Sequence, residues 1–440
     1  MFRDVTISRS MKIKRILINL AHKLRPLFPQ VAVNYLYHFP KAYLASRLYG
    51  NPGQDLEIIG VTGTDGKTTT STLIYHILKT AKKKVALVST VDAKIGRSSI
   101  KTGFHITSPN PFALQALLRR MRSQKVRYVV LEVTSHGLDQ YRIYPLRPKI
   151  AVLTNITHEH LDYHGTFEKY RDAKLKLFKS AQHAVVNKDL PIFAEINARL
   201  PKVMFSTYSL HADSQMKPDR IEYLADKTIF TLGNITYTIP ITGEYNLYNA
   251  LAAISTALLL DINTSDIKRA LVSFRGVRGR LEEIPNKRGI HAFVDFAHTP
   301  NALHEVLTNL RSKLGSGEKL IVVFGAAGLR DVSKRPLMGK EASTLANMIV
   351  LTSEDPRFEN PVSIAKEIMS GMPSKIRKEV VIEVDRAKAI DYAINHLAKR
   401  GDWVVTCGKG HEESMNLDGY TETAWSEHEA LLSALNKNHE

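Results

Sequence analysis

The sequence has a single cysteine, Cys407, among its 440 residues, which excludes an intrachain disulfide and a cysteine-cluster metal site. It also lacks a long apolar run: the longest nearly apolar stretch, residues 248–260, falls short of the ~20 residues that span a bilayer. No signal-peptide pattern opens the chain. These absences predict a soluble protein of a reducing, cytoplasmic compartment.

Acidic residues are few relative to basic ones. The chain has 61 Lys and Arg against 43 Asp and Glu, a formal net charge of +18, and its first 50 residues contain nine basic residues and one Asp. Such an excess favours polyanions without naming one. Nucleic acid, an anionic nucleotide substrate and a membrane surface all fit, but no recognised nucleic-acid motif accompanies the charge.

The length is that of two or three domains, and the hydrophobic share of 44% is typical of a globular protein. We expect a basic, mostly helical segment at residues 1–54, a central domain at 55–275 and a second domain at 276–440. The last boundary follows from a glycine- and arginine-rich stretch without periodicity, residues 274–282.

The opening segment contains a basic amphipathic pattern at residues 12–25, where apolar residues recur at helical spacing and Lys or Arg fill the other face. Either this helix packs on the body with a solvated basic face, or it attaches to anionic lipid. Residues 29–53 predict a short helix and a turn.

Both later parts alternate apolar strands with helical patterns, which predicts an α/β fold with mostly parallel sheets covered on both faces. Central strands are expected at residues 56–61, 84–89, 128–133, 150–155 and 184–187. Strands of the second part are expected at 292–296, 319–324, 348–352, 380–384 and 403–406. Because no Gly-x-Gly-x-x-Gly fingerprint occurs there, a redox dinucleotide is not expected.

Residues 60–70 (GVTGTDGKTTT) lie between a predicted strand and a predicted helix. Such a loop wraps backbone N–H groups around a polyphosphate, while Lys67 adds positive charge and the Thr68 hydroxyl can hold Mg²⁺. The general pattern has Gly where Val61 stands, so an ordinary glycine-rich turn is the alternative. We predict a phosphate site because strand, loop and helix follow in the required order.

Two polar stretches come directly after predicted strands, residues 132–137 (EVTSHG) and 154–160 (TNITHEH). Either stretch alone could be an ordinary polar loop without a functional role. Since ligands gather at the carboxyl ends of parallel strands, both become candidates for a metal-nucleotide site beside the phosphate loop.

Together these motifs resemble the Mur ligase family, the ATP-dependent amide-bond formers that build the stem peptide of peptidoglycan. Residues 132–140 (EVTSHGLDQ) and 154–165 (TNITHEHLDYHG) are similar to the members that add the third amino acid, with Glu159 in place of Asp. The resemblance implies Mg²⁺ ligation by Glu132 and His160, beside Thr68. It implies muropeptide contacts at Thr107, Ser108, Ser135, His136 and Arg142.

Residues 171–178 (RDAKLKLF) continue the resemblance, and Lys174 aligns with the lysine that the family carbamylates. A carbamate turns an ammonium into an anion that can hold a second Mg²⁺. Without that resemblance, an exposed helix lysine would be the simpler interpretation. Catalytic roles are thus implied for Lys67, Glu132, His160 and Lys174.

Further segments resemble the family's nucleotide contacts: residues 242–253 (TGEYNLYNALAA) and 294–301 (VDFAHTPN). Asn249 would lie near the adenine, and Arg280 would reach back from the connecting segment. The implied ATP contacts are Gly63, Thr64, Asp65, Gly66, Lys67, Thr68, Thr69, Asn155, Asn249, Arg280, Asp295 and His298.

Residues 354–357 (EDPR) and 408–412 (GKGHE) resemble motifs by which some members bind meso-diaminopimelate. An arginine fork reads a carboxylate bidentately, so Arg357 suits the second carboxylate of that amino acid rather than the ammonium of lysine. Asp355 and Leu329 depart from the usual Asn and Asp. The implied contacts are Arg330, Asp355, Arg357, Gly408 and Glu412.

The resemblance therefore implies a monomeric, cytoplasmic ligase that uses ATP and Mg²⁺ to add meso-diaminopimelate to UDP-N-acetylmuramoyl-L-Ala-D-Glu. Family members usually begin with a larger α/β domain that holds the uridine diphosphate, whereas only about 55 residues precede the first predicted strand here. A lipid-linked acceptor, another amino acid and contact of residues 12–25 with an anionic membrane stay open. A nucleic-acid-associated P-loop NTPase, suggested by the positive charge, is the alternative from another class.

Overall fold

The computed structural model describes residues 29–100, 108–157, 159–377 and 379–437. Its central unit is built on an eight-stranded sheet in the order β4-β3-β2-β5-β1-β6-β7-β8. The six strands from β2 to β8 in this order are parallel, and β3 and β4 form an antiparallel edge. The bounds are β1 Glu57–Thr62, β2 Val85–Val88, β3 Ala93–Ile95, β4 Ser98–Ile100, β5 Tyr128–Glu132, β6 Ile150–Leu153, β7 His183–Asn187 and β8 Met204–Tyr208.

The central strands are apolar on both faces because helices cover both faces. Along β1, Ile59 and Val61 point into one core cluster, and Ile58 points into the other. The first cluster is closed by α4 (Lys67–Thr80), α10 (Glu244–Leu258) and α11 (Thr264–Ser273). The second is closed by α5 (Pro111–Ser123), α6 (Ser135–Asp139), α7 (Leu161–His164), α8 (Phe167–Leu175) and α9 (Phe193–Arg199). All five strands predicted for this part are confirmed to within two residues.

A three-stranded antiparallel sheet in the order β11-β10-β9 was not predicted. Its strands are β9 Arg220–Tyr223, β10 Thr228–Leu232 and β11 Ile235–Ile239. The expectation of simple strand-helix alternation up to residue 274 was therefore incomplete. The sequence does contain a signal: two residues, Gly233 and Asn234, connect β10 to β11, and Gly233 has φ 56°, as a tight hairpin requires.

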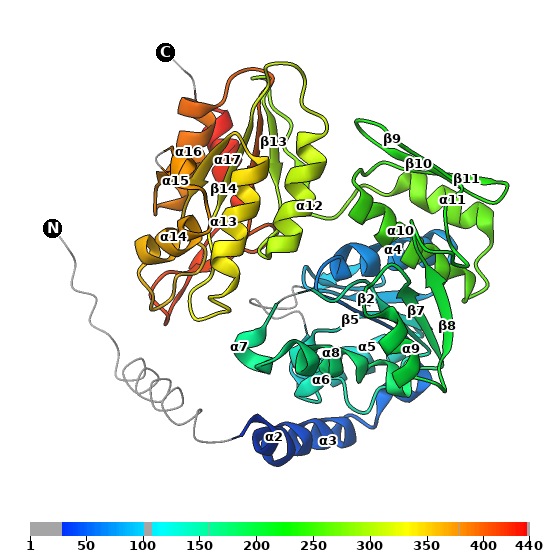
Figure 1. Ribbon diagram of the computed structural model, residues 1–440. Coiled ribbons are helices and arrows are strands. Elements are labelled where there is room, and N and C mark those ends of the chain that lie inside the picture. The colour runs from blue at the N-terminus through cyan, green and yellow to red at the C-terminus, as the bar shows by residue number, and fades with distance from the viewer. Residues whose placement is uncertain (1–28, 101–107, 158, 378, 438–440) are drawn as a thin grey trace.

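The second unit has a six-stranded sheet in the order β12-β13-β17-β14-β15-β16, parallel except for β12. The five predicted strands are present as β13 His291–Val294, β14 Leu320–Phe324, β15 Met348–Leu351, β16 Val381–Ile382 and β17 Trp403–Thr406. Three further strands were not predicted: β12 Glu282–Glu283 and the hairpin of β18 Ser414–Asn416 and β19 Glu422–Ala424. One face of this sheet packs on α12 (Pro300–Arg311), α13 (Lys334–Leu345) and α14 (Pro361–Ser370), and the short α15 (Ser374–Arg377) contacts the same core through Ile376. The other face packs on α16 (Arg386–Tyr392) and α17 (Glu427–Leu435). Figure 1 shows the two units, with α12 on the side of the second unit that faces the central one.

The predicted short helix before the central unit is α2 (Gln30–Val33), a π-helical stretch Asn34–His38 and α3 (Phe39–Leu48), followed by a turn. These elements run on as one helix along the bottom of the view in Figure 1. The predicted helix at residues 12–25 lies outside the described residues. Within the described ranges, no helix is long and apolar enough to cross a membrane.

Candidate functional site

The phosphate loop connects the end of β1 at Thr62 to the start of α4 at Lys67. Gly66 has φ 79°, and a Cβ there would collide with the side chain of Asn249, so the turn requires glycine. The loop is held from outside, because Asn155 Oδ1 accepts hydrogen bonds from the N–H groups of Thr64 and Asp65, at 3.1 and 2.8 Å. The loop leads directly into the N-terminus of α4, a helix of 14 residues, and the N-terminus of a helix favours bound anions.

Lys67 lies at the centre of this loop. Its Nζ donates a hydrogen bond to the Thr64 carbonyl oxygen at 2.8 Å, and burial lowers the pKa of its ammonium. A cation at the first turn of a helix, where the leading N–H groups have no partner within the helix, is suited to phosphate oxygens.

A carboxylate and a hydroxyl meet at the first turn of α4. Thr68 Oγ1 donates to Glu132 at 3.0 Å, and Glu132, which is buried, also accepts from the N–H and the hydroxyl of Thr90, both at 2.9 Å. Arg280 Nη2 reaches Thr68 Oγ1 at 3.2 Å from the segment between the two units.

These oxygen donors fit a small hard cation such as Mg²⁺, which takes one or two carboxylates and completes its shell with phosphate and water. Among the described residues, no group of three or more His, Cys, Asp and Glu side chains is arranged so that it could hold a metal ion by itself. His160 lies edge-on to His136, with ring centroids 4.8 Å apart, and burial keeps its pKa well below the usual range. A neutral imidazole is the form that binds a metal.

Lys174 on α8 is buried, and the exposed-lysine interpretation is wrong. Its Nζ donates to the Gly63 carbonyl oxygen at 2.6 Å and lies 4.4 Å from the centre of the Tyr170 ring. Burial, followed by the charge of Lys67, lowers the pKa of Lys174 well below its usual range. The neutral amine therefore forms more readily at this position than in an exposed lysine.

A cavity of about 260 Å³ lies between the phosphate loop, α10 and the second unit. Asn249 lines it and accepts a hydrogen bond from Thr70 Oγ1 at 3.1 Å, directly behind the loop. Asp295 lines it too and accepts from the N–H groups of Leu281 and Ala297. His298 lies near this wall with its pKa lowered to about 3, chiefly by burial. Twelve implied ATP contacts thus come from two units, and eight of them line this one cavity: Asp65, Gly66, Thr68, Thr69, Asn155, Asn249, Arg280 and Asp295.

The predicted muropeptide contacts gather at the start of α6. Ser108 Oγ accepts a hydrogen bond from the N–H of Thr134 at 3.1 Å, and Arg142 donates to the Ser108 carbonyl oxygen at 2.9 Å. His136 lies edge-on to His160 and is tilted against the Tyr163 ring, and its pKa is lowered to about 3, chiefly by burial. The hydroxyl of Ser135 is buried and has no partner in the described part of the chain. Thr107 lies outside the described residues.

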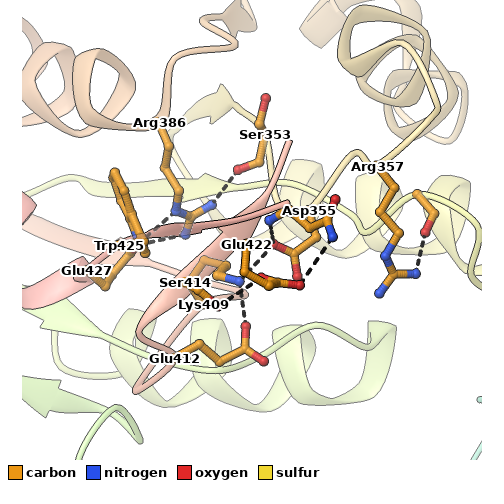
Figure 2. Close-up of polar contacts among 12 residues, drawn as sticks. Ser353, Asp355, Arg357, Arg386, Lys409, Glu412, Ser414, Glu422, Trp425 and Glu427 are labelled. Atoms are coloured by element: carbon orange, nitrogen blue, oxygen red, sulfur yellow. Dashed lines mark hydrogen bonds and ion pairs between the residues drawn. The ribbon is translucent and has the colours of Figure 1, made fainter. Parts of the chain in front are cut away.

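Four of the five predicted amino-acid contacts follow the carboxyl ends of β15 and β17, namely Asp355, Arg357, Gly408 and Glu412, while Arg330 follows β14. Figure 2 shows Asp355, Arg357 and Glu412. Asp355 accepts hydrogen bonds from Lys409 Nζ and from the N–H of Asn416, each at 3.0 Å. Lys409 also pairs with Glu412 at 2.6 Å. Arg357 points away from this network and donates to the Gly328 carbonyl oxygen at 2.8 Å. Gly408 has φ 106°, and a Cβ there would collide with the Glu354 carboxyl.

Arg330 connects the two substrate clusters electrostatically. Its charge contributes to the lowered pKa of Arg357, after burial, and to that of His136. Arg330 is therefore close enough to both His136 of the central unit and Arg357 of the second unit for its charge to act on each of them.

The two units are joined by buried polar contacts. Lys334 Nζ pairs with Glu159 Oε1 at 3.1 Å, and both side chains are 4% exposed. Asp65 of the phosphate loop accepts from Thr299 Oγ1 and Asn301 Nδ2, at 3.2 and 3.1 Å. These contacts hold the second unit against the phosphate loop.

Sequence reasoning missed four polar groups of this region, namely Thr90, Lys334, Glu354 and Lys409. Glu354 and Lys409 lie inside the segments EDPR and GKGHE described above, and these segments are the signal that could have found them. Thr90 follows a strand without a motif, and nothing in the sequence indicates that it would reach Glu132.

The fold and the site define a class: α/β nucleotide-binding proteins in which a phosphate loop faces a second α/β unit. Comparison with known proteins assigns the chain to one family within this class. Residues 61–257 match the Mur ligase middle domain, and residues 279–410 match the Mur ligase, glutamate ligase domain. The UDP-N-acetylmuramoyl-L-alanyl-D-glutamate--2,6-diaminopimelate ligase of Syntrophomonas wolfei subsp. wolfei is 38% identical over 380 residues, which cover 84% of this chain and 76% of that protein. The chain belongs to the Mur ligase family.

Solved structures agree with this assignment. A structure of a UDP-N-acetylmuramoyl-L-alanyl-D-glutamate--2,6-diaminopimelate ligase is 30% identical with a TM-score of 0.59, and the match covers 90% of this chain and 82% of that one. Mycobacterium tuberculosis folylpolyglutamate synthase, at 16% identity, has a TM-score of 0.68 over 91% of this chain and 96% of that one. The second likeness concerns the fold alone.

Proposed function

We propose that this Mur ligase is an ATP-dependent amide ligase that adds meso-diaminopimelate to UDP-N-acetylmuramoyl-L-Ala-D-Glu. The observation that carries the proposal is a continuous series of neighbours from the phosphate loop to the amino-acid contacts. Lys174 Nζ donates to the Gly63 carbonyl oxygen of the loop and lies over the Tyr170 ring, Tyr170 packs edge-on against His160, and His160 packs edge-on against His136. The charge of Arg330 acts on both His136 and Arg357. The candidate sites for ATP, the muropeptide and the amino acid are thus neighbours.

In the proposed reaction, a carboxylate oxygen of the acceptor attacks the γ-phosphorus of ATP, the bond to ADP breaks, and an acyl phosphate forms. The amine nitrogen then attacks the acyl carbon, phosphate leaves with the electrons of the C–O bond, and the amine loses a proton. Lys67 and Arg280 would offset the negative charge that develops on the transferred group. Closure of the second unit over the loop would align the amine.

We assign a Mg²⁺ site to Thr68, Glu132 and His160. When bound, the ion supplies positive charge close to the transferring phosphoryl group. The oxygen donors and the neutral imidazole described above support this assignment.

Lys174 is assigned a carbamate. A neutral amine can add carbon dioxide and release a proton, and the buried position of Lys174 beside Gly63 favours the neutral amine. The resulting anion would lie next to the phosphate loop and would hold a second Mg²⁺, which would supply positive charge beside the triphosphate.

The choice of meso-diaminopimelate rests on Arg357 and Arg330. Two guanidinium groups near each other suit a carboxylate and disfavour the side-chain ammonium of lysine. Asp355, in place of the usual Asn, is already engaged by Lys409, so its charge is offset within the protein.

The acceptor is proposed to be the soluble UDP-linked muropeptide, because the muropeptide motifs of the central unit are complete in the sequence. We propose a cytoplasmic, monomeric enzyme. A lipid-linked acceptor is the alternative, and contact of residues 12–25 with an anionic membrane would suit it.

Phosphate release tests this function. We expect release from ATP only when a UDP-muropeptide and meso-diaminopimelate are both present. Release that depends on a lipid-linked muropeptide would replace the acceptor, and release stimulated by DNA or RNA without any muropeptide would replace the function with that of a nucleic-acid-associated NTPase.

A further inference from the structure

The helix at residues 30–48 exposes an unusual number of apolar side chains. Among the described residues, 20 large apolar side chains are exposed, and seven of them belong to this helix. Leu36, Leu44 and Leu48 are 81%, 52% and 64% exposed, and Tyr37 is 57% exposed. Single exposed apolar residues are normal, but a concentrated patch marks an interaction surface.

The opposite face of the helix is already occupied by the central unit. Asn34 Nδ2 donates to Asp139 Oδ2 at 2.7 Å, and the Phe39 ring packs edge-on against Tyr141 and Tyr144 at 5.3 and 5.2 Å. The outward face of the helix therefore adds a second group of apolar side chains to those on the packed face. So many apolar side chains on the outward face favour an apolar environment on that side as well.

The charge around the outward face indicates what that environment is. Residues 30–50 contain no Asp or Glu. Lys41 lies over the Tyr37 ring at 5.5 Å, and Arg47 lies over the Tyr43 ring at 5.3 Å. Leucines flanked by tyrosines and cations are typical of helices that lie in the interface of an anionic membrane.

Two other occupants of this face come into question, a second copy of the chain and residues 1–28, and both carry a net positive charge. A second copy of the chain carries the same net charge of +18. The preceding segment, residues 1–28, has seven basic residues and one acidic residue. Anionic phospholipid offers the opposite charge together with an apolar layer.

We propose that the helix at residues 30–48 is a docking surface for an anionic phospholipid membrane. Leu36, Leu44 and Leu48 enter the acyl boundary, while Lys41 and Arg47 lie among the headgroup phosphates. The bond between Asn34 and Asp139, at the end of α6, then places the candidate muropeptide contacts next to the membrane. The proposal does not depend on which acceptor the enzyme uses.

Vesicle sedimentation of the full-length protein tests the proposal. We expect binding to vesicles that contain phosphatidylglycerol, weak binding to phosphatidylcholine alone, and loss of binding at high salt. The double variant Leu36→Glu with Leu44→Glu should bind about ten-fold less or weaker still, because two charges would enter the acyl boundary. The matched control, Leu258→Glu with Val272→Glu, changes residues 40% and 59% exposed on α10 and in α11 and should bind like the wild type.

A site-specific probe gives a second readout. The only native cysteine, Cys407, is fully buried, so Leu44→Cys can be labelled with an environment-sensitive dye. Its emission should shift to the blue when phosphatidylglycerol vesicles are added, whereas that of labelled Val272→Cys should not.

Three results would overturn the proposal. The first is a wild-type protein that does not sediment with anionic vesicles, or a double variant that sediments equally well. The second is a dimer that the double variant converts to a monomer, which would assign the face to a second copy. The third is a lower melting temperature of the double variant without vesicle binding by the wild type, which would assign the face to residues 1–28.

Discussion

Glu354 is a fully buried carboxyl group that gives the fold a specific pH dependence. Burial raises its pKa to about 7 against the opposing charges of Lys334, Arg386 and Lys409. Its Oε2 atom has no hydrogen-bond partner in the described part of the chain. The folded protein therefore holds this proton more tightly than the unfolded chain does.

The sign and size of the effect follow from the two pKa values. Below pH 4.5 the group is protonated in both states, and between pH 4.5 and about 7 only the unfolded state loses the proton. The free energy of unfolding therefore falls as the pH rises through this window and levels off above it. A pKa of about 7 against an ordinary value of 4.5 corresponds to a loss of about 3 kcal/mol by pH 8.

The variant Glu354→Gln removes the titrating group and keeps the shape. We expect its stability relative to the wild type to increase by about 3 kcal/mol between pH 4.5 and pH 8. Urea unfolding followed by tryptophan fluorescence suits the measurement, since both tryptophans, Trp403 and Trp425, lie in the second unit. Glu222→Gln, an exposed residue of β9, is the control. Parallel pH profiles of Glu354→Gln and the wild type would refute the reasoning.

Three substitutions test the catalytic site. Lys67→Ala removes a cation from the transferring phosphate and should lower kcat/KM by about 100-fold or more in the phosphate-release assay, and near-normal ligation would exclude the ATP assignment. Lys174→Ala should lose most activity and regain part of it with added short carboxylates, which can occupy the anionic position, whereas a fully active variant would exclude the carbamate. Arg357→Ala should raise KM for meso-diaminopimelate by about 10- to 100-fold, because a charged hydrogen bond is lost, and leave KM for ATP nearly unchanged. An equal rise in both constants would contradict a specific contact.

The parts of this protein that could be predicted are those set by local sequence. Continuous apolar runs located β1, β5, β6, β14 and β17, since strands buried on both faces need no alternation. The phosphate loop followed from glycine and lysine spacing.

What could not be predicted depends on segments distant in sequence. Lys334 meets Glu159 across 175 positions, and Lys409 meets Asp355 across 54. The burial of Lys174 depends on how α8 packs under the phosphate loop, so its sequence neighbours gave no indication of it. The antiparallel sheet was missed although its hairpin turn at Gly233 carries a recognisable signal.

The most direct test of the central claim is a competition read by mass spectrometry. The purified protein would receive ATP, UDP-N-acetylmuramoyl-L-Ala-D-Glu and equal concentrations of meso-diaminopimelate and lysine, and the acceptor would be analysed for its gain in mass. We predict that the acceptor gains the residue mass of diaminopimelate, with one ADP and one phosphate released per product. An acceptor that gains lysine, or one that stays unchanged while ATP is consumed, would contradict the account.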